Sequence, residues 1–308
     1  MGNIVLSDDA ACWPELRLAD WKDTCATLHM WTQIVGKVRL KLTPLVNHWW
    51  NVPLYVTARG LTTSRIAYGA RAFELRFDFV AHELVLETTE GAVKTLKLEP
   101  KTVAEFYREC MEMLRSEGIE VKIWRMPAEV PDPVAFDEDT VHAAYDAEKV
   151  ERFWRILLSA DAVFQEFRAE FIGKASPVHF FWGSFDLAVT RFSGRRAPER
   201  PGADAITREA YSHEVSSVGF WPGSAGGPDA AFYSYAAPTP EAFSLARVRP
   251  DAARWDAGLG EFLLMYEDVR KSASPSRALL EFCRSTYEAA ARFGQWDRGA
   301  LERLAIPL

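Results

Sequence analysis

In the first half of the chain, polar and apolar positions alternate over several short runs. Apolar and basic residues alternate over 38–42, and this period of two predicts a strand with one solvated face. Residues 52–58 and 73–79 predict two further strands, and residues 83–99 predict a hairpin that turns near Glu90. Successive strands joined by short turns indicate an antiparallel sheet.

From residue 103 onward, apolar residues also recur at the longer spacing that is typical of helices. Apolar residues recur every three or four positions over 103–114, which predicts a helix packed on one side, and residues 118–124 predict a closing strand. Residues 126–140 contain three prolines and several acids, which indicates a boundary or a crossover. A wide apolar stripe then predicts a long helix over 141–172, ended by Gly173.

The second half is read as three further strands that alternate with loops before closing helices. The last helix is the clearest, because Ser274 occupies the N-cap position and Pro275 the first turn. The expected segments are a strand at 178–193, a basic loop at 194–205, a strand at 215–221, a glycine-rich loop at 222–230 and a strand at 231–236.

Together these elements predict an α+β fold, with antiparallel sheets packed by the long central helix and by the C-terminal helices. The expected division is an N-terminal half (1–127), a linker with the long helix (128–175) and a C-terminal half (176–308), and the halves could form one compact unit. A weak similarity between the segments that begin at His29 and His179 leaves open a duplication about a pseudo-twofold axis.

Composition narrows the class of protein. Of the 308 residues, 48% are hydrophobic and 26% charged, which is typical of a folded globular chain. The 11 Trp, 19 Phe and 9 Tyr can fill a core or line a ligand cavity. A net charge of −7 argues against a nucleic-acid partner. We expect no membrane partner, since no apolar run approaches the roughly 18 residues of a span and no signal peptide is evident. Four widely spaced cysteines indicate reduced thiols and a cytoplasmic protein.

Residues 176–202 hold the strongest chemical signal, because polar side chains interrupt an aromatic strand. His179 and Asp186 would face opposite sides of a regular strand. Gly183 lies between them, and a bulge there would bring both to one face and into a cavity. The alternative is a structural histidine bonded to a carbonyl and an aspartate at the rim of the sheet.

The same stretch is rich in arginine. Arg191 still lies within the strand pattern, so we expect it to face a pocket and to bind an anion through its guanidinium fork. Arg195, Arg196 and Arg200 lie in the basic loop and are expected to be solvated.

Other candidates follow along the chain. His213 and Glu214 are neighbours just before the predicted 215–221 strand, so in an extended conformation one would reach the cavity while the other faces away. His213 and His179 are the acid–base candidates, with Asp186 as the orienting carboxylate. The remaining candidates for substrate binding are polar or aromatic: His48, Trp182, Trp221, Tyr233 and Tyr235.

A divalent metal is an open alternative. His48, His179, His213 and Glu214 could supply the ligands of an iron or zinc site. No short-spaced pair such as HxH or HExxH supports this, and no GxSxG or GK[ST] motif indicates a hydrolase or a phosphate loop.

Four stretches carry a resemblance: NHWWNVPLYVTARGL, HFFWGSFDLAVTRFSGR, SHEVSSVGFWPG and FYSYAAP. Together they resemble an uncharacterised bacterial family, a domain of unknown function, over nearly the whole chain. The resemblance implies a bacterial protein and no activity or cofactor.

The hypothesis from sequence is therefore a site for a small anionic metabolite, in an enzyme that uses His and Asp for acid–base chemistry and Arg191 as the anion clamp. A metal-dependent oxygenase or hydrolase and a non-catalytic binding protein are the alternatives. The sequence does not indicate a substrate, a reaction type or an oligomeric state.

Overall fold

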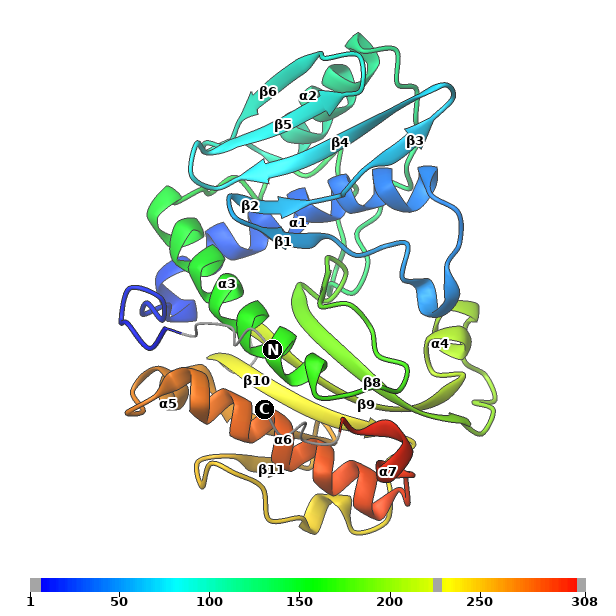
Figure 1. Cartoon of the computed structure of the whole chain (residues 1–308). Coiled ribbons are helices and arrows are strands. Elements are labelled where there is room, and N and C mark those ends of the chain that lie inside the picture. Colours follow the sequence, from blue (N-terminus) through cyan, green and yellow to red (C-terminus); the bar gives the residue numbers. More distant parts are fainter. Residues whose placement is uncertain (1–6, 224–228, 304–308) are drawn as a thin grey trace.

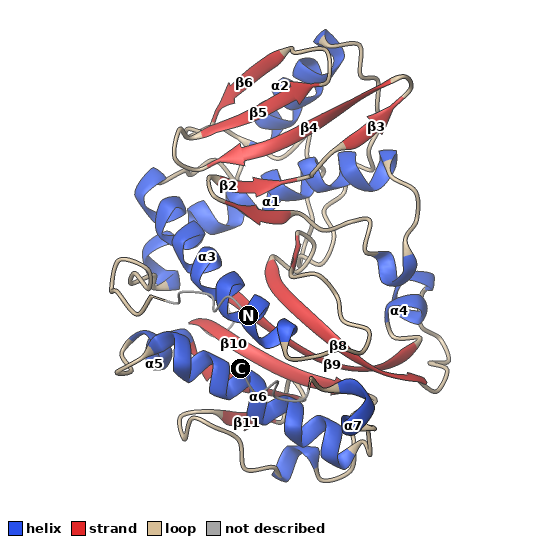
Figure 2. Ribbon diagram, viewed as in Figure 1, coloured by secondary structure: helices blue, strands red, loops and turns tan. Residues whose placement is uncertain are grey.

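The strands form two antiparallel sheets, one in each half of the chain, and helices pack against both (Figure 2). The computed structural model describes residues 7–223 and 229–303. The architecture is α+β, as the sequence pattern predicted.

The N-terminal sheet has the strand order β1-β2-β4-β5-β6, and the short strand β3 pairs with β4 (Figure 1). Its strands are β1 (Tyr55–Thr57), β2 (Gly60–Thr62), β3 (Ile66–Tyr68), β4 (Arg71–Asp78), β5 (Glu83–Thr88) and β6 (Val93–Lys97). Helices α1 (Leu18–Leu42) and α2 (Val103–Ser116) pack against this half. The predicted 83–99 hairpin and the helix over 103–114 are confirmed. Thr102 and Glu105 form a reciprocal capping box at the start of α2.

The strand expected at 38–42 is wrong, because these residues form the last turns of α1. The alternation suggested a solvated basic face, but Lys37 and Arg39 are both buried. Lys37 Nζ donates to the carbonyl of Met126 at 2.6 Å, and Arg39 donates to the carbonyl of Thr63. Distant backbone carbonyls therefore allow two basic side chains to be buried in a part of α1 that is covered on all sides.

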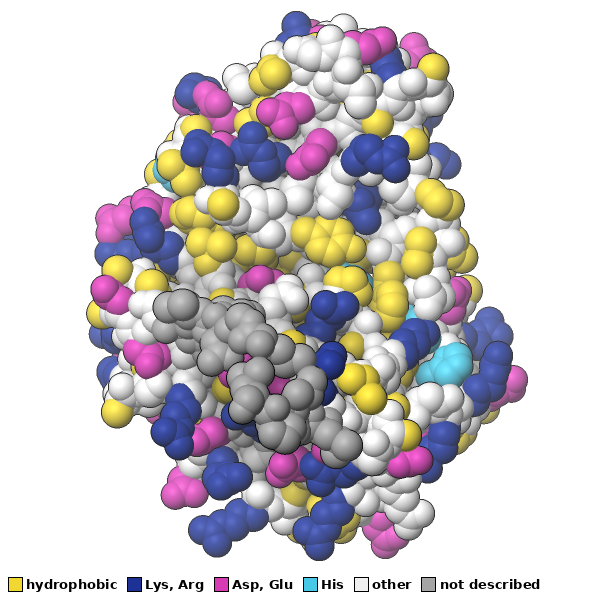
Figure 3. Space-filling model, in the orientation of Figure 1, with side chains coloured by type: hydrophobic (Ala, Val, Ile, Leu, Met, Phe, Trp, Pro, Cys, Tyr) yellow, Lys and Arg dark blue, Asp and Glu magenta, His cyan; other side chains and the backbone are white. Residues whose placement is uncertain are grey.

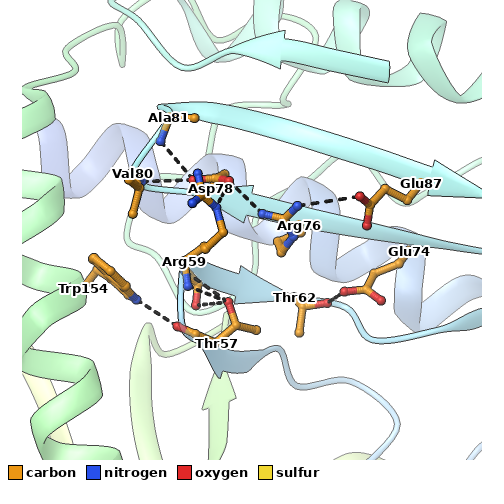
Figure 4. Close-up of polar contacts among 11 residues, drawn as sticks. Thr57, Arg59, Thr62, Glu74, Arg76, Asp78, Val80, Ala81, Glu87 and Trp154 are labelled. Carbon is orange, nitrogen blue, oxygen red and sulfur yellow. Dashed lines mark hydrogen bonds and ion pairs between the residues drawn. The ribbon is translucent and has the colours of Figure 1, made fainter. Parts of the chain in front are cut away.

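A polar network at the end of β4 fixes the β4–β5 turn (Figure 4). Asp78 accepts hydrogen bonds from the amides of Val80 and Ala81 and from the guanidinium groups of Arg59 and Arg76. Burial opposes ionisation of Asp78, but these donors outweigh it and lower its pKa to about 2. The network thus keeps a negative charge at the turn.

Helix α3 (Ala147–Ala169) links the two halves. It is shorter at both ends than the predicted 141–172 helix. Asp146 sets the N-terminus, because its side chain accepts a hydrogen bond from the amide of Lys149 at 3.2 Å. Trp154 Nε1 donates to the carbonyl of Thr57 in β1 at 3.1 Å (Figure 4). The strand expected at 118–124 is absent from the described chain, since these residues pair with no strand.

The C-terminal sheet has the order β11-β12-β10-β9-β8-β7. Helices α3 and α6 cover one face of it, with α5 beside β10 (Figure 1). The elements are β7 (His179–Phe181), β8 (Asp186–Arg196), α4 (Ala205–Ala210), β9 (His213–Gly223), β10 (Asp229–Ala237), β11 (Arg254–Asp256), β12 (Glu261–Met265), α5 (Tyr266–Arg270), α6 (Pro275–Phe293) and α7 (Arg298–Leu301), with short 3-10 turns at η1 (Asn47–Trp49) and η2 (Phe243–Leu245).

The single strand expected at 178–193 is wrong, because two strands and a tight turn occupy it. Residues 182–185 form the turn, closed by the amide of Phe185 donating to the carbonyl of Phe181 at 2.8 Å. Phe185 has a φ of +59°, which a continuous strand excludes. His179 pairs with Ala188 and Phe181 with Asp186, so His179 and Asp186 share one face of the sheet through a hairpin rather than a bulge.

The two halves are joined directly. Leu54, beside β1, exchanges two backbone hydrogen bonds with Phe180 of β7, at 2.9 and 3.0 Å. Buried apolar residues from both halves form one continuous core cluster. The domain boundaries near 127 and 175 stay predictions.

The structure does not support a duplication that relates the segments beginning at His29 and His179. His29 lies in helix α1 whereas His179 lies in a strand, so the two segments are not equivalent. Part of the expected glycine-rich loop, residues 224–228, lies outside the described residues.

Helix α6 begins where the sequence predicted, but the residue that caps it differs. Ser274 occupies the N-cap position, and its hydroxyl donates to Asp8 at 2.6 Å instead of capping the helix. Asp8 itself accepts from the amide of Ser276 at 2.9 Å, so the N-terminal segment supplies the cap. Within residues 7–223 and 229–303, no helix has both the length and the hydropathy that a membrane span needs.

Candidate functional site

A cavity of about 690 Å³ lies on the face of the C-terminal sheet opposite α6, within the range of small-molecule sites. The sheet forms its floor, while η1, α4 and the crossover after α2 supply the other walls. Aromatic side chains dominate the lining: Trp49, Trp50, Phe181, Trp182, Phe192, Tyr211, Trp221, Tyr233 and Tyr235.

The floor follows from the period of two along each strand. On β8, alternate residues from Asp186 to Phe192 line the cavity, and on β10 Tyr233 and Tyr235 do so. Tyr233 pairs with Gly219 on β9, and a Cβ at position 219 would overlap the Tyr233 ring. Glycine at 219 therefore lets the tyrosine ring lie flat across β9.

The Tyr233 hydroxyl thereby reaches Asp186, which also accepts a hydrogen bond from Ser184 Oγ. Asp186 is 6% exposed, and within the described chain no Lys or Arg lies at ion-pair distance from it. Burial raises the pKa of Asp186, and the hydrogen bonds from Ser184 and Tyr233 offset this only in part. The site therefore contains a carboxyl group that resists ionisation.

Two further carboxyl groups line the same cavity. Burial, and after it the charge of Asp186, raises the pKa of Glu129, and the same two causes raise that of Glu261 to about 7. Neighbouring carboxyl groups that cannot all ionise share protons and attract a cation.

Helix α1 fixes the cavity wall that contains Glu129, through hydrogen bonds to the backbone of the preceding residue. The Gln33 amide accepts from the amide of Ala128 and donates to its carbonyl, both at 2.8 Å. Glu129 has a φ of +56°, and its Oε1 would lie 2.5 Å from a Cβ at Gly183. A side chain at Gly36 would overlap the Trp182 ring. Small residues at 36 and 183 thus leave room for this wall.

His48 lies in the roof, in a left-handed conformation with a φ of +59°. Its Nδ1 lies 3.1 Å from the carbonyl of Glu209, and since a carbonyl only accepts, Nδ1 carries the proton. Nε2 can then accept from Lys174 Nζ at 2.6 Å. Burial first, and the charge of Lys174 next, lower the pKa of His48. His48 is therefore a neutral histidine that orients Lys174.

Six of the residues predicted from sequence line the cavity, and the rest do not. The six are His48, Trp182, Asp186, Trp221, Tyr233 and Tyr235. His179 faces the same side of the sheet but is fully buried beneath Trp50 and Tyr55. His213 lies at the margin, its ring 5.6 Å from that of His48, and hydrogen-bonds Ser212.

The anion clamp expected at Arg191 is wrong, because its side chain lies on the opposite face of β8. Arg191 is 2% exposed and donates to the carbonyl of Phe167 in α3. Its guanidinium carbon lies 3.5 Å from the centroid of the Phe167 ring and 4.3 Å from that of Tyr287. Arg191 therefore packs α3 and α6 against the sheet. Alternation along the strand was predicted correctly, but the pocket face was not.

The four residues considered as metal ligands do not converge. Glu214 faces away and pairs with Arg195 at 2.7 Å, and His179 is sealed beneath aromatic rings. Over the described ranges, no group of three or more His, Cys, Asp or Glu side chains is arranged to hold a metal ion.

Sequence reasoning missed Glu129 and Glu261. Glu129 lies in the proline-rich crossover, and Glu261 begins β12, a strand that the pattern did not indicate. Neither carries a local signal, because only the fold brings them to Asp186.

The chain matches a family of unknown function (DUF5996) over residues 13–303. It belongs to that family. This agrees with the resemblance found in the sequence. No curated protein and no solved structure matches the chain.

Proposed function

We propose that the cavity binds a small organic cation, an amine attached to an aromatic or aliphatic body. The observation that carries the proposal is the lining, which combines three carboxyl groups with aromatic rings and includes no Lys or Arg among the described residues. This differs from the anionic metabolite expected from sequence, since that expectation depended on Arg191.

Two physical arguments support a cation. An ammonium group gains from the faces of Trp and Tyr rings, and it gains most where water is excluded. It also stabilises the ionised forms of Asp186, Glu129 and Glu261, whose pKa values are raised without it. The apolar body of the ligand would occupy the space beside Trp182 and Trp221.

The experiment compares three probes of one shape: phenethylamine, phenethyl alcohol and hydrocinnamate, titrated by calorimetry. We expect the amine to bind at least about tenfold more tightly than the alcohol, and the carboxylate to bind most weakly. Glu129→Gln should weaken only the amine. Glu112→Gln, at an exposed position on α2, is the matched control and should change nothing. Equal affinity for amine and alcohol would refute the proposal.

Catalysis is a second candidate, carried by Asp186. Burial raises the pKa of Asp186, and a carboxyl group that holds its proton more firmly than an ordinary aspartate can transfer a proton to or from a bound substrate. Asp186→Asn keeps the shape of the side chain and removes the transferable proton. Loss of turnover on an identified substrate with retained binding would distinguish an enzyme from a binding protein.

The protein's setting is part of the proposal. We infer a bacterial cytoplasmic protein, supported by the family resemblance and by four free cysteines, three of them buried.

A further inference from the structure

A group of basic side chains meets behind the Trp50 ring, outside the cavity that is proposed to bind an amine (the amine pocket). Arg39 comes from the end of α1, Arg168 from the last turn of α3, and His179 from the start of β7. Lys174 Nζ lies 5.3 Å from the centroid of the Trp50 ring, and the His179 ring lies 5.7 Å from it on centroids. Helix α1 and the segment from the end of α3 to the start of β7, which are distant in sequence, therefore bring these basic side chains to one place.

The deepest members of this group have unpartnered polar atoms. His179 is fully buried, and neither of its ring nitrogens has a hydrogen-bond partner. Arg39 is 9% exposed, and its Nε is likewise buried without a partner. Its guanidinium carbon lies 5.5 Å from the centroid of the Tyr55 ring, and Tyr55 also contacts His179. Buried polar groups of this kind are normally satisfied, so two side by side indicate a missing partner.

The charges are also uncompensated. Across the residues that the structure describes, Arg39, Arg168 and Lys174 have no carboxylate within 4.0 Å, whereas Arg59, Arg195 and Arg284 each pair with one. Burying a guanidinium without a counter-ion is costly. Burial first, and then the charges of Arg39 and Arg168, lower the pKa of His179 to about 3. An anion here would supply both the counter-charge and the missing hydrogen-bond acceptors.

We propose that Arg39, Arg168, Lys174 and His179 form a binding site for an oxyanion, the phosphate or carboxylate group of a small molecule. Lys174 is exposed and Trp50 and Arg168 are half-buried, so the rim is open to solvent while the floor is not. Figure 3 shows Lys and Arg side chains next to a band of hydrophobic side chains across the middle of the molecule. Trp50 also lines the amine pocket, and the basic residues do not, so this site goes beyond the proposed function and is tested separately.

The test titrates the full chain with inorganic phosphate and, separately, with acetate, at an ionic strength held constant with chloride. Calorimetry gives the affinity. Arg168→Gln and Lys174→Gln change the rim without removing a fully buried group, and each should weaken binding by about tenfold. Lys122→Gln, at an exposed position, is the matched control.

Saturable binding of either ion that the rim variants weaken supports the site, and the ion preferred identifies the ligand as phosphate or carboxylate. A second readout is the His179 ring followed by NMR, because a bound anion should raise its pKa above the value without the anion. No saturable binding of either ion, or equal binding by Arg168→Gln, Lys174→Gln and Lys122→Gln, would overturn the proposal. Neither result changes the expected behaviour of the amine probes.

Discussion

Tyr233 on β10 donates its phenolic hydrogen to Asp186 on β8, across the intervening strand β9. The hydrogen bond exists because residue 219, between the two, has no side chain. A polar pair at the centre of an aromatic floor is thus produced by one glycine on a third strand, and the pocket depends on that position.

Gly219→Ala should therefore destabilise the fold and weaken amine binding together. The new Cβ would overlap the Tyr233 ring and lie 2.7 Å from the carbonyl oxygen of Leu187, which is backbone and cannot move freely. We expect a loss of about 1–3 kcal/mol in the free energy of unfolding, measured by urea denaturation. Gly299→Ala is the control, because its Cβ would meet only Asp297, at 3.6 Å. Equal stability of Gly219→Ala and wild type would show that Tyr233 does not hold this position.

Glu261 makes stability depend on pH. Its pKa is about 7 in the folded chain against an ordinary value of 4.5, with burial as the main cause and Asp186 next. Between these values the unfolded chain ionises first, so the free energy of unfolding falls as pH rises through the window. Wild type should lose stability relative to Glu261→Gln across it, measured by urea denaturation on either side. A constant difference between the two proteins would contradict the raised pKa.

Arg191 should matter for stability and not for binding. Arg191→Met removes the contact to the Phe167 carbonyl and the stacking on Phe167 and Tyr287. We expect the free energy of unfolding to fall by about 3 kcal/mol, with amine affinity unchanged. Arg195→Ala, which removes an exposed pair with Glu214, should cost no more than about 1 kcal/mol. A large loss of amine affinity in Arg191→Met, with an unchanged free energy of unfolding, would show that Arg191 contributes to the binding site instead.

Local signals in the sequence were enough for several elements. The apolar stripe of α2, the turn after Glu90 and the proline at the start of α6 predict structure from neighbours within a few residues, and each was confirmed. The C-terminal turns of α1 were misread, because the burial of Lys37 and Arg39 depends on carbonyls at Met126 and Thr63.

The candidate site could be predicted only in part, for a related reason. The middle of β8 is buried on both faces, so alternation separates Asp186 from Arg191 without indicating which of them faces the cavity. The tertiary packing determines which residue faces the cavity, because α3 and α6 cover the face that carries Arg191. Glu129 lies in a crossover and Glu261 at the start of β12, and no short-range pattern in the sequence marks either residue as close to Asp186.

We infer that a cation binds at carboxyl groups whose pKa values are raised in its absence. Calorimetric titration with phenethylamine near pH 7, in two buffers of different ionisation enthalpy, measures the protons released on binding. We predict net proton release for wild type, less release for Glu261→Gln, and none when phenethyl alcohol replaces the amine. Binding of the amine with no proton release, at an affinity equal to that of the alcohol, would contradict the account.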